Sequence, residues 1–325
     1  MNKKDAPLVS IILICYNQEK FIAEALEGIF SQTYSPLEII IVDDCSTDGT
    51  PDIIKKRLKF ESNASDVHFI QNPKNLDATN SSLIGFNKAR GDFFILSCGD
   101  DIMLPEMVAE MVLTWQKHQV SLVTMNASYI NENSELLERT YRQLDVEADD
   151  SFETLARDGS NACCFGPAIG FERDLYKQYG WPPSYLNGFD IMMPFWAYLQ
   201  KGARFINKLL FKYRIHSKNS SASLIAERSD GYEKEMALEQ IYYQHLAHSL
   251  LMRDTLENLK AVSPKKYTEI ANKILPLLTT QTIEMSRKLV NIRKQMHYSK
   301  LKKSATTTYS PALEESNCPN AQKSV

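Results

Sequence analysis

The stretch "VSIILICYNQEKFIAEALEGIFSQTYSPLEIIIVDDCSTDGT" occupies residues 9–50 and decides the fold class. Two of its runs, within 8–15 and 37–44, are almost entirely apolar and rich in Val and Ile. Such runs are typical of strands that are buried on both faces of a parallel sheet. Between them, apolar residues recur at helical spacing over 21–30. Strand, helix and strand in this order predict the beginning of an α/β sheet.

The same alternation continues to about residue 126. Further strands are predicted at 67–72, 92–98 and 120–126, and further helices at 51–60, 81–89 and 105–118. We therefore predict an α/β protein with a doubly wound, mostly parallel sheet and a helical C-terminal extension. The pattern divides the chain into segments 1–126, 127–225, 226–304 and 305–325, of which the third is helical and the last is a polar, disordered tail.

Composition excludes several classes of protein. Hydrophobic residues make up 43% of the chain, charged residues 24%, and the net charge is −3, so no global attraction to nucleic acid is expected. None of the six cysteines forms a C-x-x-C pair, which argues against a zinc site or a disulfide framework. Without a signal peptide or an apolar stretch of 18 residues, we expect a cytoplasmic protein with no transmembrane helix.

Polar side chains gather where the predicted strands end. They are Tyr16, Asn17 and Glu19 after the first strand, Asp43 and Asp44 after the second, Asn75 and Asp77 after the third, and Asp100 and Asp101 after the fourth. Ligands of open α/β sheets bind at this edge. A carboxylate cluster without a nearby lysine suits Mg²⁺ or Mn²⁺, with the phosphates of a nucleoside diphosphate completing the shell. Taken singly, "VDDCSTDGT" and "CGDD" also fit turns and helix starts.

The combination of these blocks closely resembles glycosyltransferase family 2, whose members have the GT-A fold. The resemblance rests on residues 9–50, on "GDFFILSCGDDIMLPEMV" with "NPKNLDATN" before it, and on the later "GFDIMMPFWAYL" and "YRIHSKNSS". It covers about residues 7–225. It implies that 1–126 form the nucleotide-sugar half and 127–225 the half that binds the acceptor and carries the catalytic base.

Site roles follow from this resemblance. Tyr16, Asn17 and Glu19 are expected to line the nucleotide pocket, and Asp44 to accept a hydrogen bond from the base, which favours uracil. Asp100 would lie near the ribose or the metal, and Asp101 would ligate Mn²⁺ or Mg²⁺. Asp190 holds the position of the general base, which deprotonates the acceptor hydroxyl in a single inverting displacement. Asp190 also fits a helix N-cap, and the two roles are compatible.

Two residues depart from the family pattern. Phe189 precedes Asp190 where many members carry an acidic pair. Cys98 stands where many members have the first Asp of Asp-x-Asp. A neutral thiol is a poor ligand for a hard cation, so metal binding is assigned to Asp101 and not to Cys98.

Two further segments carry candidate contacts. In "YRIHSKNSS", Arg214 could pair with a phosphate, and His216 could ligate the metal or bond a phosphate. Residues 287–303 hold seven Lys or Arg and no acid, with apolar residues at helical spacing. This basic helix predicts peripheral contact with the inner face of a membrane, or else a solvated helix that packs on its own domain.

The sequence thus predicts an inverting, metal-dependent glycosyltransferase of the hexosyl or N-acetylhexosaminyl type. Its donor would be a nucleotide sugar, with UDP as the nucleotide, and its acceptor a saccharide or lipid-linked saccharide of a bacterial surface polysaccharide. The alternatives are a sugar-nucleotide-binding protein that has lost catalysis, a sugar nucleotidyltransferase, and a response-regulator-like receiver. The last two fit poorly, because "CYNQEKF" lacks the glycine of a nucleotidyltransferase loop and "IVDD" ends the second strand, not the first.

Overall fold

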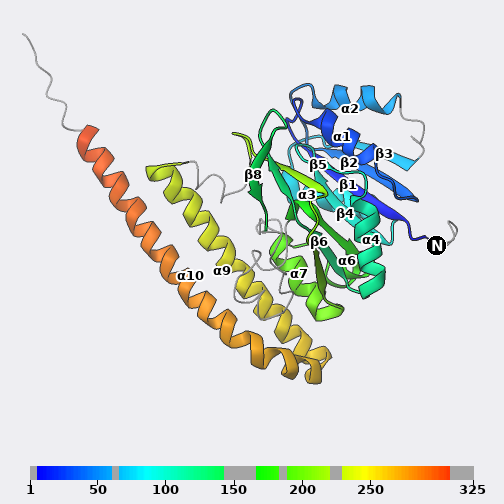
Figure 1. Cartoon of the computed structure of the whole chain (residues 1–325). Coiled ribbons are helices and arrows are strands. Elements are labelled where there is room, and N and C mark those ends of the chain that lie inside the picture. Colours follow the sequence, from blue (N-terminus) through cyan, green and yellow to red (C-terminus); the bar gives the residue numbers. More distant parts are fainter. Residues whose placement is uncertain (1–5, 61–65, 143–165, 183–188, 220–228, 308–325) are drawn as a thin grey trace, which may run out of the picture. The chain divides into compact units, whose positions relative to one another are not determined.

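The structure is a computed structural model that describes residues 6–60, 66–142, 166–182, 189–219 and 229–307 (Figure 1). It divides into two compact units. Unit 1 comprises the described residues of Met1–Asn219 and Gln244–Met285, and unit 2 those of Ser220–Tyr243 and Ser286–Val325.

The N-terminal part alternates strands and helices as the sequence predicts. Its elements are β1 (Val9–Cys15), α1 (Ile22–Phe30), β2 (Leu37–Asp43), α2 (Thr50–Leu58), β3 (Val67–Gln71), α3 (Asp77–Lys88), β4 (Phe93–Cys98), β5 (Ile102–Met103), α4 (Met107–His118) and β6 (Leu122–Met125). Every predicted strand and helix up to residue 126 is confirmed. The short β5 is an addition, because two residues are too few to show a period.

A seven-stranded sheet forms the centre of unit 1, in the order β10-β6-β9-β4-β1-β2-β3. Pairing is parallel except along β9 (Ile169–Glu172), which runs antiparallel to both β4 and β6. β10 (Ala203–Ile206) adds a parallel strand beyond β6. The predicted doubly wound, mostly parallel sheet is therefore confirmed, and its carboxyl edge carries the ends of β1, β2 and β4 together.

A second sheet of four strands has the order β5-β11-β7-β8. β7 (Ser128–Ile130), β8 (Leu136–Thr140) and β11 (Phe211–Arg214) come from the second half of the domain. β11 pairs antiparallel with β5, with Phe211 opposite Met103. This pairing brings Arg214 to the turn between β4 and β5.

The core lies on both faces of the large sheet. Along β1, Ile11 belongs to one buried cluster, which includes side chains of α1, α2 and α4. Ile12 belongs to the other, which includes side chains of α3, α6 (Arg173–Tyr179) and α7 (Phe189–Gln200). Both residues have no exposed surface. Burial on both faces explains why the strands read as continuous apolar runs instead of alternating.

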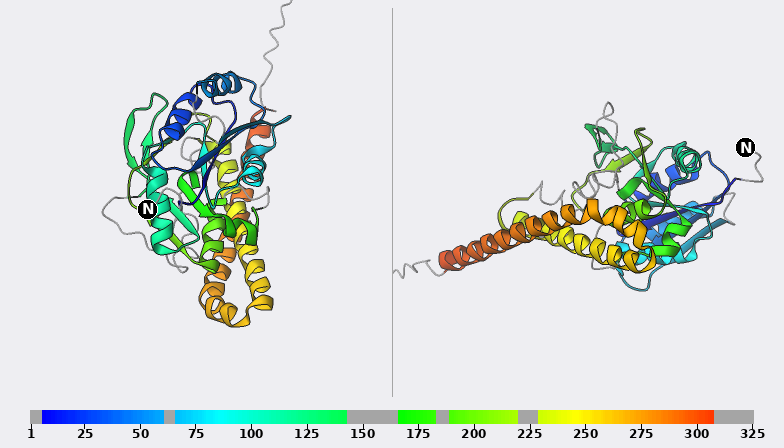
Figure 2. Two further views of the ribbon diagram at one scale, coloured as in Figure 1. Left: turned by 90° about the vertical axis from the view of Figure 1, so that its right-hand side faces the viewer. Right: turned by 90° about the horizontal axis from the view of Figure 1, so that it is seen from below.

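Two long helices, α9 (Gly231–Val262) and α10 (Pro264–Thr307), run antiparallel and side by side (Figure 2). Within unit 1, Leu256 and Ile274 are buried in the same cluster as α7. The part of the helical extension in Gln244–Met285 therefore packs on the sheet domain. None of the helices in the described ranges is both long and apolar enough to cross a membrane.

The basic segment 287–303 lies in α10, with side chains described up to residue 297. Within unit 2, Leu289 and Ile292 are buried. Arg293 Nε donates to Glu239 Oε1 at 2.6 Å. The apolar positions of this helix are thus used inside the unit, which favours packing on the protein over packing on a membrane. Membrane contact through the basic side chains stays a prediction.

Gly85 in α3 offers a test of the packing between helix and sheet. A Cβ at this position would lie 2.4 Å from Cγ2 of the buried, β-branched Ile12. Alanine gains about 1 kcal/mol of helix propensity, but overpacking costs about 1–3 kcal/mol. We expect Gly85→Ala to lower the free energy of unfolding by up to about 2 kcal/mol in urea denaturation.

The control is Lys88→Ala, an exposed position of the same helix, which should change stability by less than about 0.5 kcal/mol. A midpoint for Gly85→Ala above that of the wild type would contradict the close contact, because the gain in helix propensity would then be unopposed.

Candidate functional site

The site is built on the turn Cys98–Asp101, which joins β4 to β5. Gly99 allows the turn to approach the end of β1, since a Cβ there would lie 2.4 Å from Gln18 Oε1 and 2.8 Å from Cys15 Cβ. The chain then enters β5, which pairs with β11. The two adjacent carboxylates are therefore held between the end of the large sheet and the second sheet.

Asp101 is buried, with 1% of its surface exposed. Its Oδ1 accepts a hydrogen bond from the Arg214 backbone N–H at 2.9 Å, whereas Oδ2 has no partner among the described residues. Burial, followed by the charge of Asp100, raises the pKa of the Asp101 carboxyl well above its ordinary value, although Arg214 opposes this rise. This carboxylate is half satisfied, and a cation would complete it.

Arg214 has no exposed surface, and protein groups accept hydrogen bonds from its guanidinium. Nε donates to the Asp100 carbonyl at 2.8 Å, and one terminal nitrogen donates to Asn131 O and Ser134 Oγ. The other terminal nitrogen lies 3.1 Å from Glu24 Oε2 in α1. Arg214 thus connects α1 and the β7–β8 connection to the acidic turn, Cys98–Asp101. From the sequence alone, Arg214 is instead expected to pair with a phosphate.

His216 lies beside Asp100 with its ring largely buried. Its Nε2 is 2.9 Å from Asp100 Oδ2, and its Nδ1 accepts from the Lys218 backbone N–H at 3.2 Å. Because Nδ1 accepts, Nε2 carries the hydrogen and donates to the carboxylate. The ring also contacts Phe21, with centroids 4.9 Å apart. In this conformation His216 holds Asp100 and leaves neither nitrogen free for a metal.

The connections after β1 and β2 are joined to each other by hydrogen bonds. Asn17 Oδ1 accepts from the Thr47 backbone N–H at 2.8 Å, and Asn17 itself has a positive φ of 51°. Glu19 Oε2 accepts from the Gly49 N–H at 2.8 Å. Both side chains therefore organise the loop in this structure. Tyr16 is 46% exposed, so its ring is accessible at this edge.

Asp44 follows β2 and is buried. Its Oδ1 accepts from Asn72 Nδ2 at 2.9 Å and from the Leu76 N–H at 2.8 Å. Among the described residues, both hydrogen bonds of the Asp44 side chain are made by Oδ1 and none by Oδ2. Asp44 is thereby fixed with one oxygen able to accept a further donor.

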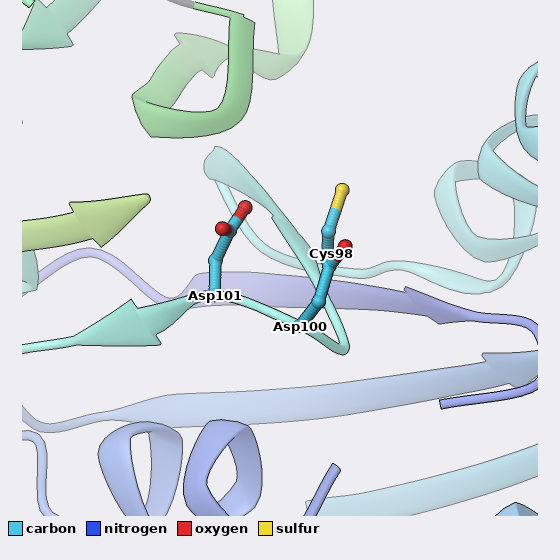
Figure 3. Close-up of side chains that lie close together, drawn as sticks. All are labelled: Cys98, Asp100 and Asp101. Atoms are coloured by element: carbon cyan, nitrogen blue, oxygen red, sulfur yellow. The ribbon is translucent and has the colours of Figure 1, made fainter. Parts of the chain in front are cut away.

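Three side chains come close enough to share an ion. Ligand atoms of Cys98, Asp100 and Asp101 lie within 4.8 Å of one another, and Figure 3 shows the three side chains on the same side of the turn. The two carboxylates and the unpartnered buried Oδ2 fit a divalent cation. Asp100 and Asp101 are thus brought together, whereas Tyr16, Asn17, Glu19 and Asp44 lie on neighbouring strand ends.

Sequence reasoning missed Glu24 and Ser134, which bind the Arg214 guanidinium. No local pattern marks them, because the contact depends on β11 pairing with β5. Asp190 falls at the second position of α7, and its side chain lies outside the described part of the chain.

The sequence matches known glycosyltransferases. An uncharacterized glycosyltransferase of Haemophilus influenzae is 34% identical over 127 residues, which are 39% of this chain and 38% of that protein. An uncharacterized glycosyltransferase of Nostoc is 25% identical over 251 residues, 73% of this chain and 74% of that protein. The chain thus spans only about two fifths of the length of the first of these relatives.

Two solved structures share the fold. S. aureus TarS 1-349 in complex with UDP-GlcNAc has a TM-score of 0.56 at 16% identity and covers 93% of both chains. The mannosyltransferase PcManGT of Pyrobaculum calidifontis, in complex with GDP-Man and Mn²⁺, has a TM-score of 0.55 at 17% identity, over 92% of this chain and 89% of that one. At this level of identity the likeness establishes a GT-A type of fold and no more.

The family itself is established by sequence. The sequence model of Glycosyl transferase family 2 matches residues 10–180, more than half of the chain. That segment contains β1 to β4, the acidic turn and the strand-end residues described above. The chain therefore belongs to Glycosyl transferase family 2.

Proposed function

We propose that this chain transfers a sugar from a UDP-sugar to a hydroxyl of a saccharide or lipid-linked saccharide, with inversion at the anomeric carbon. The observation that carries the proposal is the buried, unpartnered Oδ2 of Asp101, which stands beside Asp100 at the carboxyl end of β4. This is the sheet edge where α/β proteins bind nucleotides. A hexosyl or N-acetylhexosaminyl donor follows from the family resemblance.

Asp101 and Asp100 would hold Mn²⁺ or Mg²⁺. When bound, the ion would stabilise negative charge on the departing nucleoside diphosphate. His216, a candidate ligand by sequence, instead bonds Asp100 through Nε2 and would act by fixing that carboxylate. Arg214 likewise would act through the turn, because its guanidinium is already bonded to protein groups.

The nucleotide would lie along the ends of β1 and β2. Asp44 Oδ1 takes both hydrogen bonds of that side chain within the described residues, so Oδ2 can accept the N–H of uracil. The exposed ring of Tyr16 offers apolar surface beside it. Asn17 and Glu19 would shape the pocket by holding the loop after β2.

Asp190 would be the general base. It stands near the start of α7, in the half of the domain assigned to the acceptor. As the acceptor oxygen attacks the anomeric carbon, Asp190 would take its proton while the bond to the diphosphate breaks. The competing proposal is a sugar-nucleotide-binding protein without catalysis, which is favoured by Cys98 in place of the common Asp.

The reaction can be tested with a panel of nucleotide sugars in the presence of Mn²⁺ or Mg²⁺. We expect transfer or slow hydrolysis of a UDP-sugar, lost in EDTA and reduced at least about 100-fold in Asp190→Asn. Asn keeps the shape of the side chain and removes its basicity. Donor binding without turnover by the wild type would support the non-catalytic protein, and full activity of Asp190→Asn would refute the assigned base.

The buried carboxyl group of Asp101 leads to a separate prediction about how stability depends on pH. Its pKa is raised in the folded state. The carboxyl group therefore favours folding in acid, and stability falls as pH rises from the unfolded pKa of about 4 toward the folded value. In metal-free protein at pH 7, Asp101→Asn should raise the melting temperature, and the gain should shrink toward about pH 4.

With Mn²⁺ at about 100 times its dissociation constant, the wild type should gain about 2.7 kcal/mol and Asp101→Asn much less. The control is Asp92→Asn, an exposed aspartate before β4, which should melt and respond to Mn²⁺ like the wild type. An equal response of Asp101→Asn would exclude Asp101 as a ligand.

A further inference from the structure

Cys98 lies in the same cluster as the two carboxylates, although the sequence argues against it as a ligand. It is the last residue of β4, a free cysteine, and half-buried. Its Sγ is among the ligand atoms that lie within 4.8 Å of one another in the turn. Figure 3 shows its side chain projecting to the same side as those of Asp100 and Asp101.

The spacing suits a single ion. With a Zn–S distance of about 2.3 Å and a Zn–O distance of about 2.0–2.2 Å, two ligand atoms of a tetrahedral ion lie about 3.3–3.7 Å apart. The ligand atoms in the turn lie within 4.8 Å of one another, so ion binding would draw them together by at most about 1.5 Å. We expect rotation of the side chains to close that difference.

A second observation concerns Asp101, which belongs to the same cluster. Asp101 is nine-tenths or more buried, and its Oδ2 has no hydrogen-bond partner within the described residues. Such an oxygen is costly unless a donor or cation reaches it. The carboxyl group with the unpartnered oxygen thus belongs to the same cluster as the Asp100 carboxylate and the thiol.

We propose that Cys98 is a ligand of the metal in this turn, and that the site consequently prefers thiophilic ions such as Zn²⁺ and Cd²⁺ to Mg²⁺. The inference rests on the proposed metal role of the turn and concerns which ion it selects. On binding, the S–H bond breaks, the proton passes to solvent, and a bond forms between sulfur and the metal. Soft sulfur ligands select Zn²⁺ over the hard ions Mg²⁺ and Mn²⁺.

The other described cysteines provide controls. Cys15 is buried and its Sγ lies 3.7 Å from Val42 O and 3.8 Å from Asp43 Oδ1, toward β2. Cys45 is half-buried in the connection after β2 and does not belong to the cluster. Cys45→Ser therefore removes an accessible thiol near the site without removing the proposed ligand.

The test is titration of the metal-free full-length protein with Cd²⁺, read by the sulfur-to-cadmium charge-transfer absorption in the ultraviolet. All variants carry Ser in place of Cys163, Cys164 and Cys318, so that these thiols cannot bind Cd²⁺. On this background we expect the band in the parent protein and in Cys45→Ser, and its loss in Cys98→Ser. Competition with a chelator should show Zn²⁺ affinity at least about tenfold lower in Cys98→Ser than in the wild type. In Cys98→Asp, affinity should shift from Zn²⁺ toward Mn²⁺ and Mg²⁺.

Mn²⁺ binding, read by the loss of its free paramagnetic signal, separates the two proposals. If Mn²⁺ binds and a UDP-sugar is turned over while Cd²⁺ gives no sulfur band, Cys98 is not a ligand and the proposed function stands. A band that persists in Cys98→Ser also overturns the inference. If neither Mn²⁺ nor Cd²⁺ binds, the metal role of the turn is wrong as well.

Discussion

The conformation of the acidic turn, Cys98–Asp101, depends on the hydrogen bonds that the buried Arg214 donates to it. A charge with no exposed surface must be surrounded by acceptors, because removing it from water is costly. Arg214 meets this demand with the Asp100 carbonyl, Asn131 O, Ser134 Oγ and Glu24 Oε2. Its own backbone N–H then holds Asp101. One residue thus joins α1, the β7–β8 connection, the Asp100 backbone and the Asp101 carboxylate.

In this arrangement the hydrogen bonds of the protein do not satisfy every polar atom of the turn among the described residues. Asp100 is held by His216 and Asp101 by Arg214, yet one oxygen of Asp101 remains without a partner among the described residues. Folding therefore maintains a buried carboxylate that is only half compensated. Stability is given up at such positions when function requires it, and a bound cation would restore the balance.

Much of the fold was accessible from sequence, for a clear physical reason. β1, β2 and β4 are buried on both faces, so their sequences are long apolar runs. The polar residues that follow these runs show where the sheet edge lies. The antiparallel β9 and the two-residue β5 carry no such signal. Both depend on pairing with strands distant in the sequence.

The site was predicted less completely than the fold. The positions of Asp100 and Asp101 at one strand end follow from local sequence. The role of Arg214 does not, because the residue it holds is 113 positions away and the contact needs β11 beside β5. On sequence alone, Cys98 is excluded as a ligand because a thiol binds hard cations poorly. Only the structure shows that its sulfur lies in the same cluster as the two carboxyl groups.

The most direct test of this account is calorimetric titration of UDP into the wild-type protein, once with saturating Mn²⁺ and once with EDTA. If the acidic turn holds a metal that contacts the diphosphate, UDP should bind at least about tenfold more tightly with Mn²⁺, a difference of about 1.4 kcal/mol. Equal affinity under the two conditions would contradict the central claim that Asp100 and Asp101 form a metal site for the nucleotide.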